Sequence, residues 1–118
     1  MAQNTGKCGS ATISYNDKCT FICVQDTTGN HWQVVCPNGN GKTTTTSGEG
    51  REISSNPSVF VDGILGFAVV GLSKVWGRSV SVSKELAKKR VKRTLSGSQE
   101  EIARTLGLQL GAKRKARR

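Results

Sequence analysis

The sequence has few of the residues from which a large hydrophobic core is built. Aromatic residues make up 5% of its 118 positions, and apolar residues as a whole make up 35%. A chain of this length has room for one domain, or for a small module with an appended tail. Because large apolar side chains are scarce, we expect a modest core that leaves part of the chain outside it.

Long hydrophobic runs are also missing. The longest, Ile64 to Leu72, spans nine residues, whereas a transmembrane helix needs about 20. Residues 1–5 lack the basic and apolar regions of a secretory signal, and the sequence contains no glycosylation acceptor or lipidation motif. We therefore expect an intracellular, cytoplasmic protein, with membrane association as the alternative.

The chain lacks a convincing set of catalytic residues. Its one histidine, His31, lies next to a turn sequence, and no acidic or amide residue is placed to orient its ring. We interpret His31 as an exposed turn residue. Because no acid, base and nucleophile converge, we expect a non-enzymatic protein without a small-molecule substrate.

What the sequence does have is positive charge, nearly all of it in the second half. Residues 74–118 hold 14 lysines and arginines against three glutamates, whereas residues 1–73 hold four basic and five acidic residues. The formal net charge of +10 therefore belongs to the C-terminal part. Such asymmetry indicates a polyanionic partner, either nucleic acid or an anionic membrane surface.

Helix signals accompany these basic residues. Ser83 is a candidate N-cap for a helix over residues 83–95, in which Glu85 and Lys89 have the spacing of a stabilising pair. Ser98 and Glu101 have the pattern of a capping box that opens a second helix. Basic side chains of this part are expected to bind phosphate or anionic lipid: Lys84, Lys88, Lys89, Arg90, Lys92, Arg93, Arg104, Lys113, Arg114, Lys115, Arg117 and Arg118.

Residues 100–108 resemble the first helix and turn of a helix-turn-helix DNA-binding motif, with Ala103 where helices approach and Gly107 at the turn. The residues that follow lack the apolar anchor that docks a recognition helix. No aromatic residue follows Trp76, which excludes base stacking by this part of the chain. Binding of nucleic acid is therefore expected to be non-specific.

All four cysteines lie in the first third of the chain, at Cys8, Cys19, Cys23 and Cys36. Residues 19–24 and 31–36 are rich in β-formers and flank Gly29-Asn30, which predicts a β-hairpin. With Gly29-Asn30 as a two-residue loop, Cys23 lies opposite Cys36, and Cys8 and Cys19 remain as the second disulfide pair. This register places Phe21, Trp32 and Val34 on the face that carries Cys23 and Cys36.

Two alternatives to disulfides remain open, namely unlinked cysteines and a zinc site that uses all four. Structural zinc sites usually contain C-x2-C pairs, and this sequence has none. No other cofactor is indicated. A reducing cytoplasm would disfavour disulfides, so the hairpin geometry and the expected location point in opposite directions.

A flexible polar linker is expected over residues 39–56, which are rich in Thr, Gly and Ser. The apolar segment that follows is compatible with two structures. In one, Asn56 caps a helix that has Pro57 at its first position. In the other, Asp62-Gly63 is the turn of a β-hairpin, and residues 79–83 add a strand. The residues expected to enter a membrane or a protein interface are Phe60, Leu65, Phe67, Val70, Leu72 and Trp76.

The sequence thus predicts a small α+β protein in four parts. These are a cysteine-bearing β-hairpin module (residues 1–38), the linker (39–56), a glycine-rich apolar element that is β or helical (57–82), and a basic helical tail (83–118). The leading hypothesis is a protein that binds nucleic-acid phosphate through its C-terminal helices. The alternatives are a membrane-associated or membrane-perturbing protein that inserts residues 59–76, and a structural or interaction subunit of a larger assembly.

Overall fold

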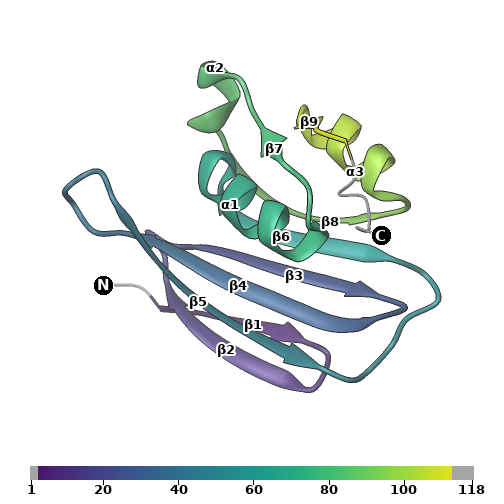
Figure 1. Ribbon diagram of the computed structural model, residues 1–118. Coiled ribbons are helices and arrows are strands. Elements are labelled where there is room, and N and C mark those ends of the chain that lie inside the picture. Colours follow the sequence, from purple (N-terminus) through teal and green to yellow (C-terminus); the bar gives the residue numbers. More distant parts are fainter. Residues whose placement is uncertain (1–2, 113–118) are drawn as a thin grey trace, which may run out of the picture.

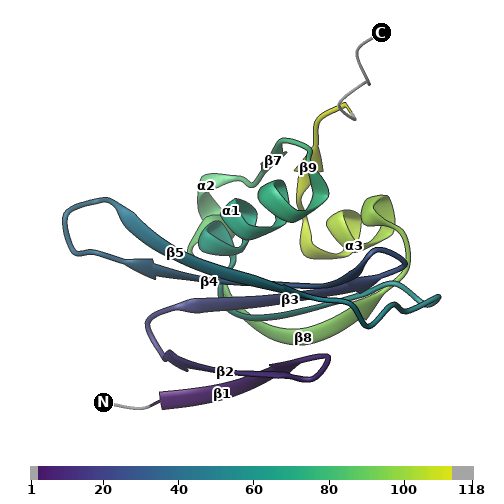
Figure 2. The same cartoon turned by 60° about the horizontal axis from the view of Figure 1, so that its bottom comes forward.

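The computed structural model describes residues 3–112 and consists mainly of β-strands (Figure 1). Five strands form one antiparallel sheet in the order β5-β4-β3-β6-β8. Helices cover one face of this sheet and the β1–β2 hairpin covers part of the other, as Figure 2 shows. The strands are β1 (Gln3–Cys8), β2 (Ala11–Asn16), β3 (Thr20–Asp26), β4 (Gly29–Pro37), β5 (Thr43–Gly50), β6 (Ser58–Ile64) and β8 (Arg90–Ser96).

Three helices and a small two-stranded sheet complete the fold. They are α1 (Leu65–Trp76), β7 (Val80–Ser81), α2 (Lys84–Ala87), α3 (Gln99–Leu106) and β9 (Gln109–Leu110). The predicted α+β fold with a basic helical C-terminal part is therefore wrong. Most of the basic segment that was expected to be helical is the edge strand β8, and α2 is a single turn of four residues.

The predicted hairpin of cysteine-bearing strands exists as β3 and β4, but its turn comes two residues earlier than predicted. Asp26 pairs with Gly29, so Thr27 and Thr28 form the loop. Asp26 Oδ1 accepts hydrogen bonds from the backbone N–H of Thr28 (2.9 Å) and from its hydroxyl (2.5 Å). An aspartate before the loop and a glycine after it favour a type I turn. This side-chain cap outweighs the Gly29-Asn30 signal.

The earlier turn keeps the predicted faces and changes the predicted partners. Each β3 residue pairs with a β4 residue that is an even number of positions from the predicted one. No side chain therefore changes face. Phe21 and Val34 pack under the β1–β2 hairpin, and Ile22 packs under the helices. Cys23 now lies opposite Trp32, so Cys23 and Cys36 do not face each other.

Two disulfides, Cys8–Cys23 and Cys19–Cys36, use all four cysteines. The predicted pairs were wrong, and both the zinc site and the free thiols are excluded by this bonding. Cys8–Cys23 links the β1–β2 hairpin to the central strand β3, and Cys19–Cys36 links the start of β3 to the end of β4. Disulfides are typical of proteins that fold in an oxidising compartment, so they do not support the cytoplasmic expectation.

Strand β5 occupies much of the segment that was expected to be a linker. Its threonines at residues 43–46 are β-branched and favour extended backbone. The strand pairs with β4 over its whole length, from Thr43 opposite Pro37 to Gly50 opposite Asn30. Because β3 pairs with both β4 and β6, the cysteine-bearing strands β3 and β4 share one sheet with the later strands β5, β6 and β8.

The apolar segment after Pro57 is a strand followed by a helix, so neither alternative describes it alone. Asp62 and Gly63 lie inside β6 and form no turn. Gly63 has a φ of 140°, and a Cβ there would lie 2.5 Å from Thr20 Oγ1, which leaves no room for a side chain. Thr20 Oγ1 accepts a hydrogen bond from the N–H of Ile64 (2.8 Å) and donates one to its carbonyl (3.1 Å).

Helix α1 begins directly after β6 and packs on the sheet. Leu65, Ala68 and Leu72 are each at most 1% exposed, and their spacing puts them on one helix face. Gly71 allows close approach, because a Cβ there would lie 2.5 Å from Ile22 Cδ1. The helix ends at Gly77, whose left-handed conformation (φ 65°) is typical of a helix C-terminus.

The predicted helix over residues 83–95 forms only its first turn. Ser83 Oγ accepts a hydrogen bond from the N–H of Leu86 (3.3 Å), which confirms the N-cap. The chain then becomes extended and pairs with β6 from Arg90 to Ser96. Val91 and Leu95 were expected on a helical stripe, but four residues is also an even spacing that fits one face of a strand. Their spacing therefore could not distinguish the two structures.

Helix α3 confirms the predicted capping box. Ser98 Oγ accepts a hydrogen bond from the N–H of Glu101 (3.2 Å), and Glu101 Oε1 accepts one from the N–H of Ser98 (3.2 Å). The helix ends at Gly107, which has a φ of 82°. The next element is the two-residue strand β9, so the resemblance to a helix-turn-helix motif stops at the turn.

Loss of the Cys19–Cys36 disulfide is expected to lower the free energy of unfolding by about 3 kcal/mol, because the unfolded chain regains the freedom of a closed loop. Denaturant titration of Cys19→Ala/Cys36→Ala measures this change.

Peptide mapping of the unreduced protein should recover Cys8 linked to Cys23 and Cys19 linked to Cys36. A peptide that links Cys23 to Cys36 would contradict the observed β3–β4 register.

Gln33 is expected to destabilise the fold. Its side chain is 2% exposed beside Gly71 of α1, and its Oε1 has no hydrogen-bond partner among residues 3–112. Gln33→Met removes this acceptor and should raise the free energy of unfolding by about 1 kcal/mol. Gln25→Met is the control, because Gln25 Nε2 donates to Asn30 Oδ1 (3.0 Å) and its loss should be destabilising. Lower stability of Gln33→Met in denaturant titration would contradict this interpretation.

Candidate functional site

The cations predicted to bind a polyanion gather where α2 leads into β8. Strand β8 is an edge of the sheet and, among residues 3–112, pairs only with β6. Its side chains alternate, so Lys92 points to the face that carries the β1–β2 hairpin, and Arg93 shares the opposite face with Leu95. All of these cations are exposed. We call this set the cationic edge: Lys84, Lys88, Lys89, Arg90, Lys92 and Arg93.

The cationic edge is not neutralised within the described part of the chain. Among residues 3–112, the ion pairs involve His31 and Arg78 and no member of the edge. Arg90 donates a hydrogen bond to the carbonyl of Asp17 (3.1 Å), which holds its guanidinium near the connection from β2 to β3. Charges on an edge strand also hinder pairing with a second sheet, so part of this pattern has a structural use.

The other predicted cations are not part of the edge. Arg104 is exposed on α3, which follows β8 in the chain. The remaining ones lie outside the described residues: Lys113, Arg114, Lys115, Arg117 and Arg118. The structure thus brings together six of the twelve predicted residues.

Three of the six residues predicted to enter a membrane or a protein interface lie in or against the hydrophobic cores. Leu65 and Leu72 are buried between α1 and the sheet. Phe60 lies on the opposite sheet face, where it packs against the core under the β1–β2 hairpin. These three side chains hold the layers together.

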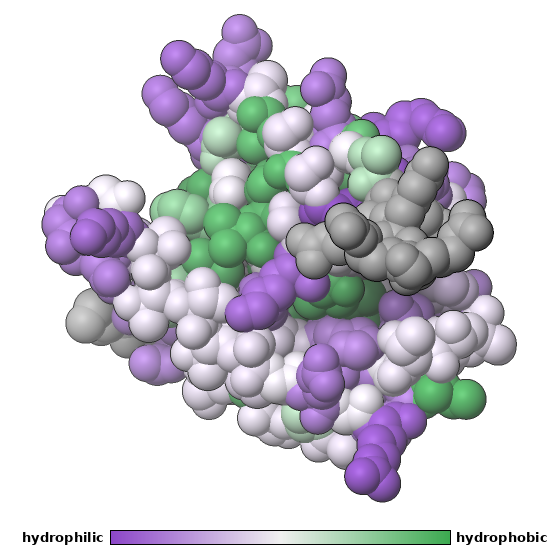
Figure 3. Space-filling model, viewed as in Figure 1, coloured by the Kyte–Doolittle hydropathy of each residue, from purple (hydrophilic) through white to green (hydrophobic). Residues whose placement is uncertain are grey.

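The other three lie on or near the outer side of α1. Val70 is 43% exposed, and Phe67 and Trp76 are half-buried. Figure 3 shows an apolar area over α1 that is bordered by hydrophilic side chains. Within residues 3–112, no helix has the length and apolar character needed to span a bilayer.

A cleft of about 360 Å³ lies between the β1–β2 hairpin and the sheet. Its floor is one sheet face, where Phe60 is opposite Thr94 and Asp62 is opposite Lys92 on the paired strands β6 and β8. Strand β1 and Tyr15 of β2 form the wall. Lys92 therefore belongs both to the cationic edge and to the cleft.

Tyr15 is the most buried polar group of the cleft. Its hydroxyl donates a hydrogen bond to Asp62 Oδ2 (2.6 Å), and its ring stacks on Phe21 with centroids 5.0 Å apart. Burial, followed by the hydrogen bond to Asp62 and its negative charge, raises the pKa of Tyr15 above the usual value. The phenol is therefore neutral at physiological pH, and its proton lies toward Asp62.

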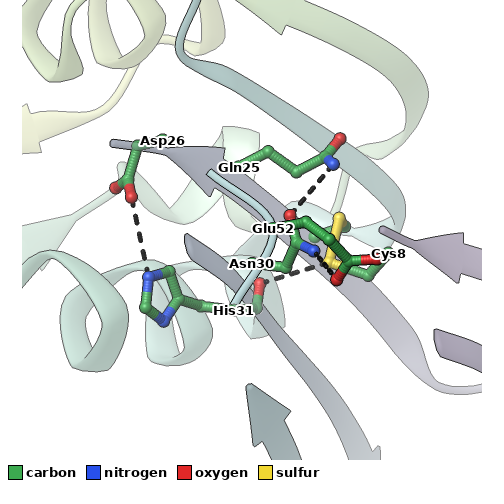
Figure 4. Close-up of a disulfide and its surroundings, with 7 residues drawn as sticks. Cys8, Gln25, Asp26, Asn30, His31 and Glu52 are labelled. Carbon is green, nitrogen blue, oxygen red and sulfur yellow. Dashed lines mark hydrogen bonds and ion pairs between the residues drawn. A yellow bond between two sulfur atoms is a disulfide. The ribbon is translucent and has the colours of Figure 1, made fainter. Parts of the chain in front are cut away.

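His31 lies in β4, and its ring faces Asp26 of β3, as Figure 4 shows. Its side chain is 18% exposed, so it is less exposed than expected. Nε2 is 2.8 Å from Thr28 Oγ1 and 3.6 Å from Asp26 Oδ1, and Nδ1 is 3.6 Å from Glu49 Oε1. The hydroxyl of Thr28 also lies 2.5 Å from Asp26 Oδ1 and directs its proton there. This network stabilises the turn and does not present Thr28 to His31 as a nucleophile.

Neither comparison with known proteins nor the arrangement of possible metal ligands indicates a function. No family model, curated protein or solved structure matches this chain. Within residues 3–112, no group of three or more His, Cys, Asp or Glu side chains could hold a metal ion. The cationic edge and the cleft are therefore the features from which function can be argued.

Sequence reasoning found the cations but not the cleft. Tyr15 and Asp62 are 47 positions apart, and only the placement of the hairpin over β6 brings them together. One signal was present, because Asp62 interrupts an otherwise apolar run around Val61 and Ile64. A charged residue in such a run points to a polar partner across the fold.

Ultraviolet titration should show that Tyr15 resists ionisation. The chain has one tyrosine, so the signal reports Tyr15 alone. We expect the phenol to stay protonated at about pH 11, above the usual tyrosine pKa of about 10. Because the folded-state pKa is raised, the stabilising contribution of Tyr15 is complete below about pH 10 and is lost as the pH rises through the folded-state pKa.

Asp62→Asn tests the cause of this shift. Removal of the carboxylate charge should lower the pKa of Tyr15 toward its usual value, while burial keeps it somewhat raised. A folded wild-type protein that titrates with a midpoint near pH 10 would contradict the observed pairing of Tyr15 with Asp62.

Proposed function

We propose that the protein is a non-enzymatic binding protein whose cationic edge binds nucleic-acid phosphate without sequence preference. The observation that carries this proposal is the set of six exposed cations on α2 and β8, which form no ion pair within residues 3–112. Lysine and arginine contacts to phosphate supply affinity without reading bases.

The position of β8 at the sheet edge suits a linear polyanion. Five of the six cations lie within residues 88–93, and side chains two apart on a strand are separated by about 6.6 Å. Lys92 and Arg93 point to opposite faces, so a chain of phosphates running along the edge can be contacted from both sides. The edge has no aromatic residue from Lys84 to Ser96, which favours phosphate contacts over base stacking.

We place the protein in an oxidising compartment, because both disulfides hold the sheet and the β1–β2 hairpin together.

An anionic membrane is the second candidate partner. The observation that favours it is the exposed Val70 beside half-buried Phe67 on α1, because apolar side chains next to cations are typical of proteins that lie on lipid surfaces.

The test is the variant Lys88→Gln/Lys89→Gln/Arg93→Gln, which leaves the cleft residue Lys92 unchanged. Binding to a labelled DNA duplex, measured by fluorescence anisotropy, should weaken roughly a hundredfold at about 0.1 M salt, and the salt slope should fall by about 2 to 3. The matched control is Lys42→Gln/Arg51→Gln/Lys74→Gln, whose residues are also exposed but lie outside the edge. It removes the same charge and should bind nearly as well as wild type.

Equal losses in the two triple variants would mean that only net charge matters, and would overturn the assignment to the cationic edge. Flotation with anionic liposomes separates the second candidate from the first. Salt screens contacts between lysine and lipid but leaves apolar insertion intact. Protein that floats after a high-salt wash, and is released by Val70→Asp, would favour the membrane.

A further inference from the structure

The cleft between the β1–β2 hairpin and the sheet is not needed for phosphate binding at the cationic edge. Its volume of about 360 Å³ lies in the range of small-ligand pockets. It opens beside β8 and is lined by strands from both halves of the chain. The polar groups that converge there are too varied for a purely electrostatic contact.

The wall of this cleft is fixed in place before any ligand arrives. Cys8 at the end of β1 is bonded to Cys23 on the floor. Gly6 of β1 packs directly against the ring of Phe21. A Cβ at this position would lie 2.5 Å from that ring, so a larger residue would not fit. Tyr15 stacks on the same ring. A site whose walls are already ordered loses little entropy on binding.

The cleft offers both acceptors and donors for hydroxyl groups. Asp62 accepts one hydrogen bond from Tyr15 at Oδ2, which leaves Oδ1 without a side-chain donor among residues 3–112. Ser58 and Thr94 line the same floor and can both donate and accept. Hydroxyl groups of a sugar need this mixture, because each one donates and accepts at once.

Two lysines and one aspartate line the cleft, which leaves it with a net positive charge. Lys7 on the wall and Lys92 on the floor line the cleft together with Asp62, and neither lysine forms an ion pair within residues 3–112. Phe60 also lines the cleft and contributes an apolar surface to it. An aromatic side chain can pack against the C–H face of a sugar ring, while the lysines pair with an acidic substituent.

We infer that this cleft binds a single acidic sugar unit. Asp62 and Tyr15 accept hydrogen bonds from its hydroxyl groups, and Lys7 and Lys92 form ion pairs with its carboxylate. The site is separate from phosphate binding at the cationic edge and shares only Lys92 with it.

The inference is tested with D-glucuronate, D-glucose and acetate as probes of the full protein, followed by amide chemical shifts in NMR titrations. Glucuronate should bind with a dissociation constant on the order of a millimolar, with the largest shifts at Phe60, Asp62 and Thr94. Glucose should bind about tenfold more weakly because it lacks the charge-assisted contact to lysine. Acetate should produce no saturable shifts at these residues.

Three variants decide the roles of the residues. Lys92→Gln should weaken glucuronate binding about tenfold and leave glucose binding unchanged. Asp62→Asn keeps the size of the side chain and should weaken both sugars at least tenfold. Arg93→Gln is the matched control on the opposite face of β8 and should change neither. The charge on Lys92 tests the site even if Asp62→Asn does not fold, because Lys92 is exposed.

Glucuronate shifts that map to Lys88 and Lys89, or equal losses in Lys92→Gln and Arg93→Gln, would overturn the inference. So would acetate binding as tight as that of glucuronate. The edge variant Lys88→Gln/Lys89→Gln/Arg93→Gln should bind glucuronate normally, so failure of the cleft and failure of phosphate binding are distinguishable.

Discussion

Both layers of the molecule depend on strand β3. It pairs with β4 on one side and with β6 on the other, and its Phe21 and Ile22 are fully buried on opposite faces. Phe21 supports the β1–β2 hairpin, whereas Ile22 supports α1 through Gly71. Cys23 ties the hairpin to the same strand. In a chain with few large apolar residues, this covalent attachment replaces part of the core that a larger domain would use.

Local signals were sufficient where the structure is set by neighbouring residues. The N-cap at Ser83, the capping box at Ser98 and the two faces of the β3–β4 hairpin all follow from short sequence patterns. The same patterns failed where pairing partners decide. Residues 90–96 became a strand because β6 offers them an edge, and the Thr27-Thr28 loop displaced the predicted turn through the cap from Asp26.

The candidate sites also divide into features that short sequence patterns predict and features that depend on contacts between distant residues. The cations of the edge could be found from composition, because exposed charge needs no partner. The disulfide pairs could not, because the two-residue change in the turn moves Cys36 away from Cys23 and next to Cys19, and Cys23 bonds Cys8 instead. The cleft could not be found either, since Tyr15 and Asp62 meet only after the hairpin has been placed over β6.

The strand order has a consequence for how the molecule approaches a partner. The cationic edge lies at β8, whereas around β5, at the opposite border of the sheet, Glu49 and Glu52 balance Lys42 and Arg51. The sheet therefore has an electrical axis that runs across its strands. A negatively charged surface exerts a torque on such a charge distribution before contact and turns β8 toward itself, most strongly at low ionic strength. The strand order thus determines which edge of the molecule turns toward a negatively charged surface.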